Sequence, residues 1–538
     1  MYRITKSLKS SGSLTIILLF VLATGVVKCK AQFLIEKDPV SKITSHISQH
    51  NKTTDNHSIF NMHYEETEYY NRFDHKLLMP LDSWDISSFC LASLGLILAA
   101  GGGIGGGGIL VPIYTLILHF TPKYAIPLSN VSVFGGAVAN VILNLRKRHP
   151  IADRPLVDWD LILIMEPLTI GGALIGAAIN KLLPELLIIL LLVVVLSTTS
   201  YRMLKKGIDL YTKENIEKRK NQPPKLEMGG VYFQTESTES LLEDIDSHLD
   251  GIHTGLALEI EQEMPMGDPV DKNNLEQNMS NFLIKDLKSQ RDADCLRQIL
   301  EKEKCVPFRK IWLIFLLFSV VVILDILKGG GGEQSPVGIV CNSVWFWVIQ
   351  GAVLLWVFVI AYLIRECLLR RTKLKEEVNY PYIEGDIVWD SRTTLVYPLI
   401  CSTAGLFAGM FGVGGGIVKG PLMLIMGVHP LVAAATSATM ILFTSLTATI
   451  SFITYGLLQY EYAIVLGTIG FVATLIGQTI MNILIKKSGR TSYIVLAIGI
   501  VVFLSAILMV IKSFSSINKN LQGLNDSKAH YSLCDSGS

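Results

Sequence analysis

The sequence has little charge for its length. Only 17% of its 538 residues are Asp, Glu, Lys or Arg, whereas an average soluble domain carries about 25%. Hydrophobic residues make up 50% of the chain, and the mean hydropathy is +0.43. Charge this sparse, together with long apolar runs, excludes an ordinary soluble protein and indicates a polytopic membrane protein.

The sequence also lacks an excess of either charge. Its 47 basic and 46 acidic residues balance, which argues against a nucleic-acid partner, because proteins that bind nucleic acid carry a basic excess. Its eight cysteines are scattered and form neither a disulfide framework nor a CxxC metal site. The apolar segments hold no HExxH motif and no nucleophile paired with a base. We therefore expect no enzyme, no cofactor and no metal.

The chain begins with features of a secretory protein. Residues 1–31 read as a signal peptide, with basic residues before an apolar core at 14–27. Lysines close to the cleavage end leave an uncleaved signal anchor open. Residues 32–85 form a polar head with glycosylation sequons at Asn51 and Asn56. These features predict a multi-pass protein of the secretory pathway, in the plasma membrane or an endomembrane.

The apolar segments divide the rest of the chain into five parts. Most segments have the roughly 20 residues that one helical crossing needs. The parts are a first transmembrane repeat (86–206), a polar cytosolic loop (207–308), two linking transmembrane helices with a cytosolic loop (309–392), a second transmembrane repeat (393–512) and a polar tail (513–538). Two apolar segments, 86–120 and 395–428, are too long for one crossing and are interrupted by glycine.

These two long segments are related to each other. Residues 103–112 align without a gap with residues 412–421, and the alignment matches four glycines, the β-branched positions and the proline. After one residue of slippage Ser129 aligns with Ser437, and residues 174–176 then match 475–477. One glycine cluster could arise from composition alone, but this order of features could not. The sequence therefore predicts an internal duplication.

The glycine runs need a physical reason inside an apolar segment. A glycine costs up to about 1 kcal/mol per helical position relative to alanine, so a run of them breaks a helix. Broken backbone persists in a bilayer only where it is buried in protein or lines a polar cavity. Close helix packing is the alternative, but it uses glycines spaced by four rather than runs. Broken helices at matching positions of two halves are typical of a transporter's binding site.

The distribution of basic residues predicts the topology. They crowd the loops near 146–154, 202–206, 370–375 and 486–490, which the positive-inside rule places in the cytosol. With a translocated head, this requires each long segment to return to the side from which it entered. We therefore predict an all-α polytopic membrane protein with two homologous halves. The halves are inverted repeats, and each opens with a glycine-broken re-entrant helix.

The paired glycine motifs, each followed by a serine-bearing span, resemble those of the sulfite exporter TauE/SafE family. The resemblance covers about 86–206 and 395–512, and the head and the long middle region resemble those of the longer, eukaryotic members. It implies a secondary transporter that moves small sulfur-containing or organic anions, such as sulfite, with a proton gradient as the driving force. The lipid bilayer and the anion are then the partners of the chain, and the oligomeric state stays open.

An anion buried in such a site needs hydrogen-bond donors and positive potential, and helix N-termini supply both. Lys419 adds a positive charge. Placing a charge at mid-bilayer costs about 2.5–3.5 kcal/mol, so an unpaired charge without a function is not expected there. Two alternatives stay open: hydroxyl groups in spans often bond to their own helix, and Lys419 could reach the membrane interface. The predicted substrate-binding residues are Gly105, Gly106, Gly107, Gly108, Ser129, Asn130, Gly414, Gly415, Gly416, Lys419, Thr436 and Ser437.

Glu166 lies inside the third span and is the predicted proton-coupling residue. Burial disfavours an ionised carboxyl group, so this side chain can take up and release a proton. It could instead do no more than pair with a basic residue. A membrane receptor or scaffold is the alternative function, since the head and the cytosolic loop could bind partners, and an anion channel is another. A receptor has no need of duplicated broken helices, so the repeat favours transport.

Overall fold

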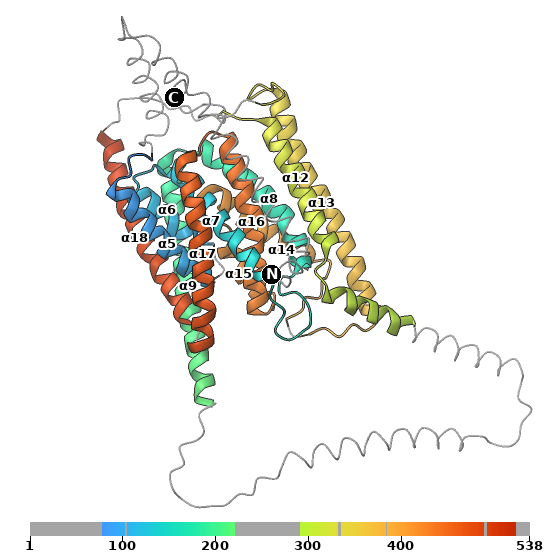
Figure 1. Cartoon of the computed structure of the whole chain (residues 1–538). Coiled ribbons are helices and arrows are strands. Elements are labelled where there is room, and N and C mark those ends of the chain that lie inside the picture. The colour runs from blue at the N-terminus through green and yellow to red at the C-terminus, as the bar shows by residue number, and fades with distance from the viewer. Residues whose placement is uncertain are drawn as a thin grey trace, which may run out of the picture. The chain divides into compact units, whose positions relative to one another are not determined.

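The computed structural model describes residues 78–102, 105–220, 291–331, 335–383, 385–488 and 492–522. The apolar segments within these residues form helices (Figure 1). The helices are α5 (Ser83–Gly102), α6 (Gly107–Leu116), α7 (Pro122–Asn144), α8 (Trp159–Leu182), α9 (Glu185–Lys220), α12 (Phe308–Lys328), α13 (Val344–Glu377), α14 (Thr393–Phe411), α15 (Gly416–Ile425), α16 (Pro430–Thr454), α17 (Tyr460–Ser488) and α18 (Ser492–Gln522). Within the described residues, nine helices are long and apolar enough to cross a membrane. The predicted all-α polytopic membrane fold is confirmed.

The chain divides into two compact units. One comprises residues 1–214 and 298–538, and it contains the helical bundle. The other comprises residues 215–297, of which the structure describes 215–220 and 291–297, both helical. The bundle carries the site described below.

The first glycine run ends α5, and α6 then folds back along it. A side chain at Gly106 would lie 2.9 Å from Leu96, and one at Gly95 would lie 2.8 Å from Ile109 and 3.9 Å from Ile113. Later residues of α6 thus contact earlier residues of α5, so the two helices form an antiparallel hairpin. The second half repeats it, because Gly415 lies beside Ala408 of α14 where α15 begins.

The helices of the two halves follow the same order and pack reciprocally. The series α5 to α9 corresponds to the series α14 to α18. Helix α8 packs along α14, and its counterpart α17 packs along α5. Helix α17 also packs on α7, and α8 packs on α16 in the same way. The two central helices, α7 and α16, contact each other and carry the most buried spans of the bundle (Figure 1).

Contacts between parallel neighbours show where each hairpin begins. Along α5 and α17, Tyr462 donates to Asp85 at one end and Gln478 donates to the carbonyl of Ala100 further on. Helix α5 therefore begins at the end of the bundle where α17 begins and α16 finishes. Helix α14 runs parallel to α8, with Gly405 against Thr169 and Gly409 against Ala173. It therefore begins at the opposite end, where α8 and α16 begin.

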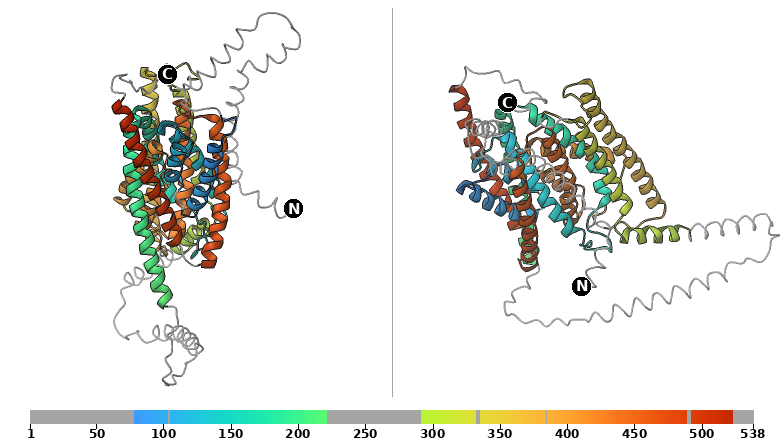
Figure 2. Two further views of the ribbon diagram at one scale, coloured as in Figure 1. Left: turned by 90° about the vertical axis from the view of Figure 1, so that its left-hand side faces the viewer. Right: turned by 45° about the horizontal axis from the view of Figure 1, so that its top comes forward.

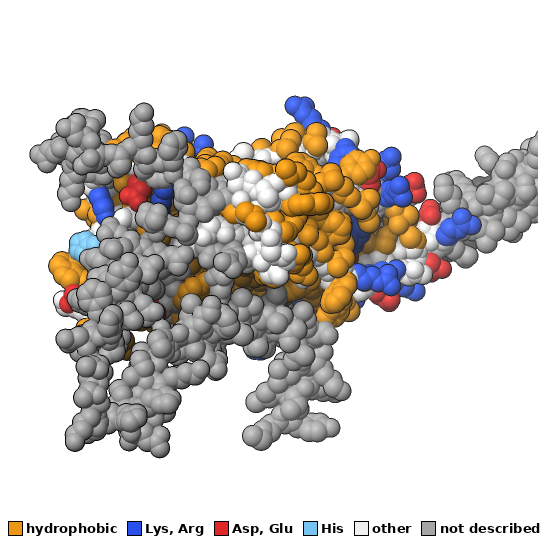
Figure 3. All heavy atoms as spheres, turned by 90° about the horizontal axis from the view of Figure 1, so that it is seen from above, with side chains coloured by type: hydrophobic (Ala, Val, Ile, Leu, Met, Phe, Trp, Pro, Cys, Tyr) orange, Lys and Arg blue, Asp and Glu red, His pale blue; other side chains and the backbone are white. Residues whose placement is uncertain are grey.

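Helices α12 and α13 form an antiparallel pair beside α8 and α16 (Figure 2). Their outward faces are apolar and exposed, with the large side chains Trp312, Ile323, Leu355, Phe358, Tyr362 and Leu363. Hydrophobic side chains also form most of the described surface in Figure 3, and charged side chains gather toward its margins. An apolar surface of this extent is typical of contact with lipid.

Candidate functional site

Both helix breaks depend on backbone conformations that favour glycine. The φ angles are +83° at Gly105 and +71° at Gly106, and they are +73° at Gly414 and +67° at Gly415. This left-handed region is sterically costly for residues that carry a Cβ atom. Gly106 and Gly415 are also the N-cap residues of α6 and α15, so each glycine run places a helix N-terminus inside the bundle.

The two breaks lie directly against each other. A Cβ atom on Gly107 would lie 2.1 Å from the carbonyl oxygen of Gly412, which leaves no room for a side chain. Val133 of α7 and Ile441 of α16 flank the contact, and each would touch a side chain placed at either Gly105 or Gly414. The N-termini of α6 and α15 therefore meet near the two central helices. The first N–H groups of each helix have no partner within that helix.

The predicted hydroxyl and amide residues lie on α7 and α16 and are fully buried. Ser129 Oγ donates to the carbonyl of Gly412 at 3.0 Å and so holds the second break. Asn130 Nδ2 donates to Ile126 O, while Asn130 Oδ1 has no partner among the described residues. Ser437 Oγ also has none there. Thr436 accepts from the Asp158 N–H at 3.0 Å, so its hydroxyl contacts the start of α8 rather than the breaks.

Lys419 and Glu166, for which the sequence predicts separate roles, form an ion pair. Lys419 Nζ lies 3.0 Å from Glu166 Oε2, and the two side chains are 0% and 1% exposed. Thr444 of α16 accepts from Lys419 Nζ at 2.7 Å and lies 2.8 Å from Glu166 Oε1. The structure thus corrects the alternative in which Lys419 reaches the membrane interface. The three residues form a closed polar cluster beside the second break.

A small cavity adjoins the first break. It is lined by Gly105 of the break, by Asn140 of α7 and by Thr474 of α17, together with apolar residues of α5, α7 and α16. Val133 and Ile441, which touch both breaks, also line it. The second break therefore has a charged cluster beside it, and the first has a small cavity that contains a few uncharged polar groups.

The family model described as Sulfite exporter TauE/SafE matches residues 88–233 and 334–528, which is more than half of the chain. The chain belongs to this family. Sulfite exporter TauE/SafE family protein 5 of Arabidopsis thaliana is 27% identical over 442 residues, which cover 82% of this chain and 85% of the relative. Family protein 3 of the same plant is 27% identical over 406 residues, covering 76% and 74%. No solved structure matches the chain.

Membership of this family confirms several expectations from the sequence. TauE/SafE proteins are membrane transporters, so the chain is a transporter of the exporter type and not an enzyme. Its apolar helices make it an integral multi-pass membrane protein. The signal segment, residues 32–77 of the head with Asn51 and Asn56, residues 221–290 of the polar loop and residues 523–538 of the tail lie outside the described residues.

The residues predicted from the sequence of this TauE/SafE protein do not include Thr444. Thr444 lies seven residues after Ser437, and therefore on the same face of α16. At this position a hydroxyl in the second half replaces Gly136 of the first half. That difference between the repeats was the available signal, but only the neighbouring Lys419 and Glu166 give it a chemical meaning.

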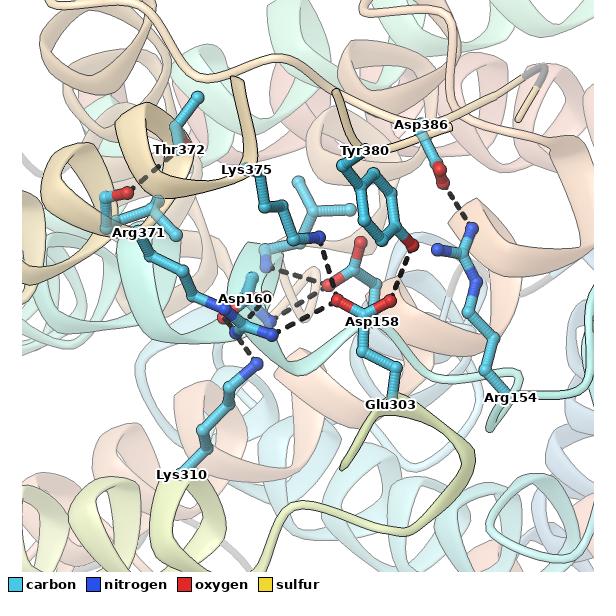
Figure 4. Close-up of polar contacts among 12 residues, drawn as sticks. Arg154, Asp158, Asp160, Glu303, Lys310, Arg371, Thr372, Lys375, Tyr380 and Asp386 are labelled. Carbon is cyan, nitrogen blue, oxygen red and sulfur yellow. Dashed lines mark hydrogen bonds and ion pairs between the residues drawn. The ribbon is translucent and has the colours of Figure 1, made fainter. Parts of the chain in front are cut away.

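A charged network surrounds the start of α8 (Figure 4). Asp160 accepts from Lys310 and Arg371 at 2.6 and 3.0 Å. Glu303 pairs with Arg371 and Lys375, and it accepts from the Tyr380 hydroxyl at 2.6 Å. Burial and this hydrogen bond raise the pKa of Tyr380, so its hydroxyl remains a donor. The network fastens α12 and α13 to α8, which carries Glu166.

The same end of the bundle holds Arg154 and Asp386, which form an ion pair. Burial alone would lower the pKa of Arg154, but the hydrogen bond and the charge of Asp386 outweigh it and raise the pKa. Two basic segments of the sequence thus lie at one end of the bundle: the loop 146–154, and residues 370–375, which form the end of α13 rather than the predicted loop. They agree with the side that the positive-inside rule assigns to them.

Proposed function

We propose that the chain is a proton-coupled secondary transporter that moves a small anion, such as sulfite or another sulfur-containing or organic anion. The transporter class follows from the family, and the names of the plant relatives refer to sulfite export. Support for an anion comes from two helix N-termini that meet inside the bundle, each with about half a positive charge. The predicted glycines 105–108 and 414–416 give the anion access to the backbone N–H groups.

The ion pair between Lys419 and Glu166 is the observation that carries the proposal of coupling. While Glu166 is ionised, it neutralises Lys419, and the cluster offers an anion no net charge. When Glu166 takes up a proton, the ammonium group of Lys419 is left without its counter-charge in a dry interior. An entering anion restores neutrality. One proton and one anion are therefore bound together, and neither binds well alone.

We further propose that the two halves are inverted repeats, as the basic loops of the sequence predict. Helices α5 and α14 begin at opposite ends of the bundle, which supports this arrangement. In such a transporter the site lies between the broken helices, and rocking of the halves exposes it to each side in turn. The contact of Gly107 with Gly412 then lies where the two halves meet.

Flux measurements in proteoliposomes test the proposed function. Vesicles with the wild-type protein are loaded with labelled sulfite, and the external pH is then stepped. We expect the pH step to drive net movement of sulfite. Glu166→Gln should abolish that response while labelled and unlabelled anion still exchange, because the variant keeps Lys419 but cannot carry the proton.

The control is the exchange of anions in both proteins at equal pH. Net flux in wild type that ignores pH would contradict proton coupling, and so would a Glu166→Gln protein that still concentrates sulfite. Selective movement of a cation would contradict the whole proposal.

A further inference from the structure

The cavity beside the first break is polar but uncharged. Its polar groups are the backbone at Gly105 and the side chains of Asn140 and Thr474, and no charged residue is among the described residues that line it. Asn140 is 5% exposed, and its Oδ1 atom is buried without a hydrogen-bond partner in the described chain. An unpaired buried acceptor costs about 1–3 kcal/mol. The cavity thus presents an acceptor that a ligand can satisfy.

The space around Thr474 depends on a glycine. A side chain at Gly136 would lie 2.6 Å from Thr474 Oγ1 and would fill this part of the cavity. Thr474 itself is 2% exposed. Because residue 136 is glycine, the hydroxyl of Thr474 and the amide of Asn140 border the same space.

Comparison of the repeats shows that these polar groups are not a shared packing feature. Under the alignment of Ser129 with Ser437, Asn140 corresponds to Ala448. Under the alignment of residues 174–176 with 475–477, Thr474 corresponds to Ala173. Each half therefore contributes one polar residue to the cavity, Asn140 from the first and Thr474 from the second, where the other half has alanine.

The charged cluster also differs between the repeats. Lys419 corresponds to Leu110, and Thr444 corresponds to Gly136. The two breaks therefore have different chemistry beside them: an ion pair at the second break, and neutral donors and an acceptor at the first.

We infer that this cavity binds the hydroxyl group of a singly charged oxyanion, so that the transporter takes its substrate as a protonated monoanion, such as hydrogen sulfite, rather than as a dianion. The inference rests on the proposed anion transport. Asn140 Oδ1 needs a donor, which a substrate hydroxyl supplies and a fully ionised oxyanion does not. Thr474 and the N–H groups of the break donate to the other oxygens. A dianion in an uncharged cavity would bear the full cost of burying unpaired charge.

Binding to the purified full-length protein in detergent tests this inference independently of transport. The probes are sulfite on the acid side of neutrality, where it carries one proton, and methanesulfonate, which has the same charge but no hydroxyl. A ligand that binds only the folded state raises the melting temperature. We expect hydrogen sulfite to raise it at concentrations at least about tenfold lower than methanesulfonate, as the loss of one hydrogen bond to a charged ligand implies.

Variants locate the contact. Asn140→Leu and Thr474→Val keep side-chain size but remove polar atoms, and we expect each to weaken hydrogen sulfite binding about tenfold. Asn140→Leu should also remove the preference over methanesulfonate. Thr447→Val is the matched control, because Thr447 is buried on α16 and its hydroxyl donates to the carbonyl of Phe443 in its own helix. This variant should bind as wild type does.

Equal stabilisation of the wild-type protein by the two probes would overturn the inference, and this result needs no variant to fold. Wild-type preference in the Asn140→Leu protein would overturn it as well. Failure of the proposed transport function would give a different result from failure of this binding inference. A protein that prefers hydrogen sulfite in detergent but shows no flux in vesicles would contradict transport and leave this binding site in place.

Discussion

Lys419 and Glu166 each carry a charge that is costly to bury alone. The ion pair between them offsets part of that cost for both. Their contact joins α15 to α8, and Thr444 adds a hydrogen bond from α16. Replacement of one partner leaves an uncompensated charge in the interior, which costs about 3–5 kcal/mol. At the scale of the residue, the cluster therefore has two roles. It is a structural contact, and protonation of Glu166 leaves the charge of Lys419 without its partner.

Single and double substitutions separate these two roles. We expect Lys419→Met and Glu166→Gln each to lower the free energy of unfolding by about 3–5 kcal/mol, and the double variant to recover most of the loss, because it leaves no unpaired charge. Lys419→Met and the double variant should also lose at least about tenfold in apparent anion affinity, or about 1.4 kcal/mol. Unfolding in detergent and competition for labelled sulfite measure the two effects.

The control for these variants is Lys373→Met, which removes an exposed lysine of α13 and should change neither quantity. Single variants as stable as the wild-type protein would show that the ion pair contributes nothing to the fold. Unchanged affinity in Lys419→Met would place the anion away from the ammonium group.

At the scale of the element, each glycine run performs two tasks. It ends one helix and starts the next through positive φ angles, and it lets two backbones approach without side chains between them. The second task is specific to the tertiary structure. Gly107 of α6 lies against the backbone of Gly412 and Val413, so the first break is shaped by the second.

Gly107→Ala should therefore abolish transport while the protein still reaches its membrane. The new methyl group would lie 2.1 Å from the Gly412 carbonyl oxygen, so the breaks must move apart. Gly351→Ala in α13 is the matched control, because nothing lies within 4 Å of the added atom. It should leave flux unchanged and stabilise its helix by about 0.5–1 kcal/mol. Membrane yield and sulfite flux measure both variants, and normal flux in Gly107→Ala would mean that the contact between the breaks is dispensable.

At the scale of the whole molecule, the basic loops and one cysteine indicate the same topology. The network of Asp160, Glu303 and Arg371 lies at the end of α12 opposite to Cys341, which follows that helix. Cys341 is disulfide-bonded. Disulfides persist in oxidising compartments, so we predict that Cys341 faces the lumen or exterior and that the charged network faces the cytosol.

This topology predicts which sites are modified. Residues 32–83 and 513–538 should face the lumen or exterior, so that Asn51 and Asn56 carry glycans, whereas Asn278 in the cytosolic loop carries none. The exposed thiol of Cys305, which is next to the charged network, should react with an impermeant reagent only from the cytosolic side. Glycopeptide mapping and sided labelling measure these outcomes. A glycan on Asn278 would reverse the topology.

The sequence by itself determined the helices, the two breaks and the membrane setting. Apolar runs of about 20 residues allow few alternatives to a membrane helix, and glycine runs interrupt a helix wherever they occur. The identity of the buried candidates, Lys419 and Glu166 among them, could also be predicted, because a charge within an apolar span rarely lacks a function. All of these conclusions depend on short stretches of chain.

The tertiary structure decided which of these residues meet. Lys419 and Glu166 are 253 residues apart in sequence, and their contact depends on how α15 and α8 are rotated and offset around α16. Packing of many side chains sets that geometry, and no local pattern encodes it. For the same reason the sequence placed Thr436 at the breaks, whereas its hydroxyl contacts the start of α8, and it missed Asn140 and Thr474. Their positions acquire a function only because the breaks of the two halves meet and leave a cavity beside them.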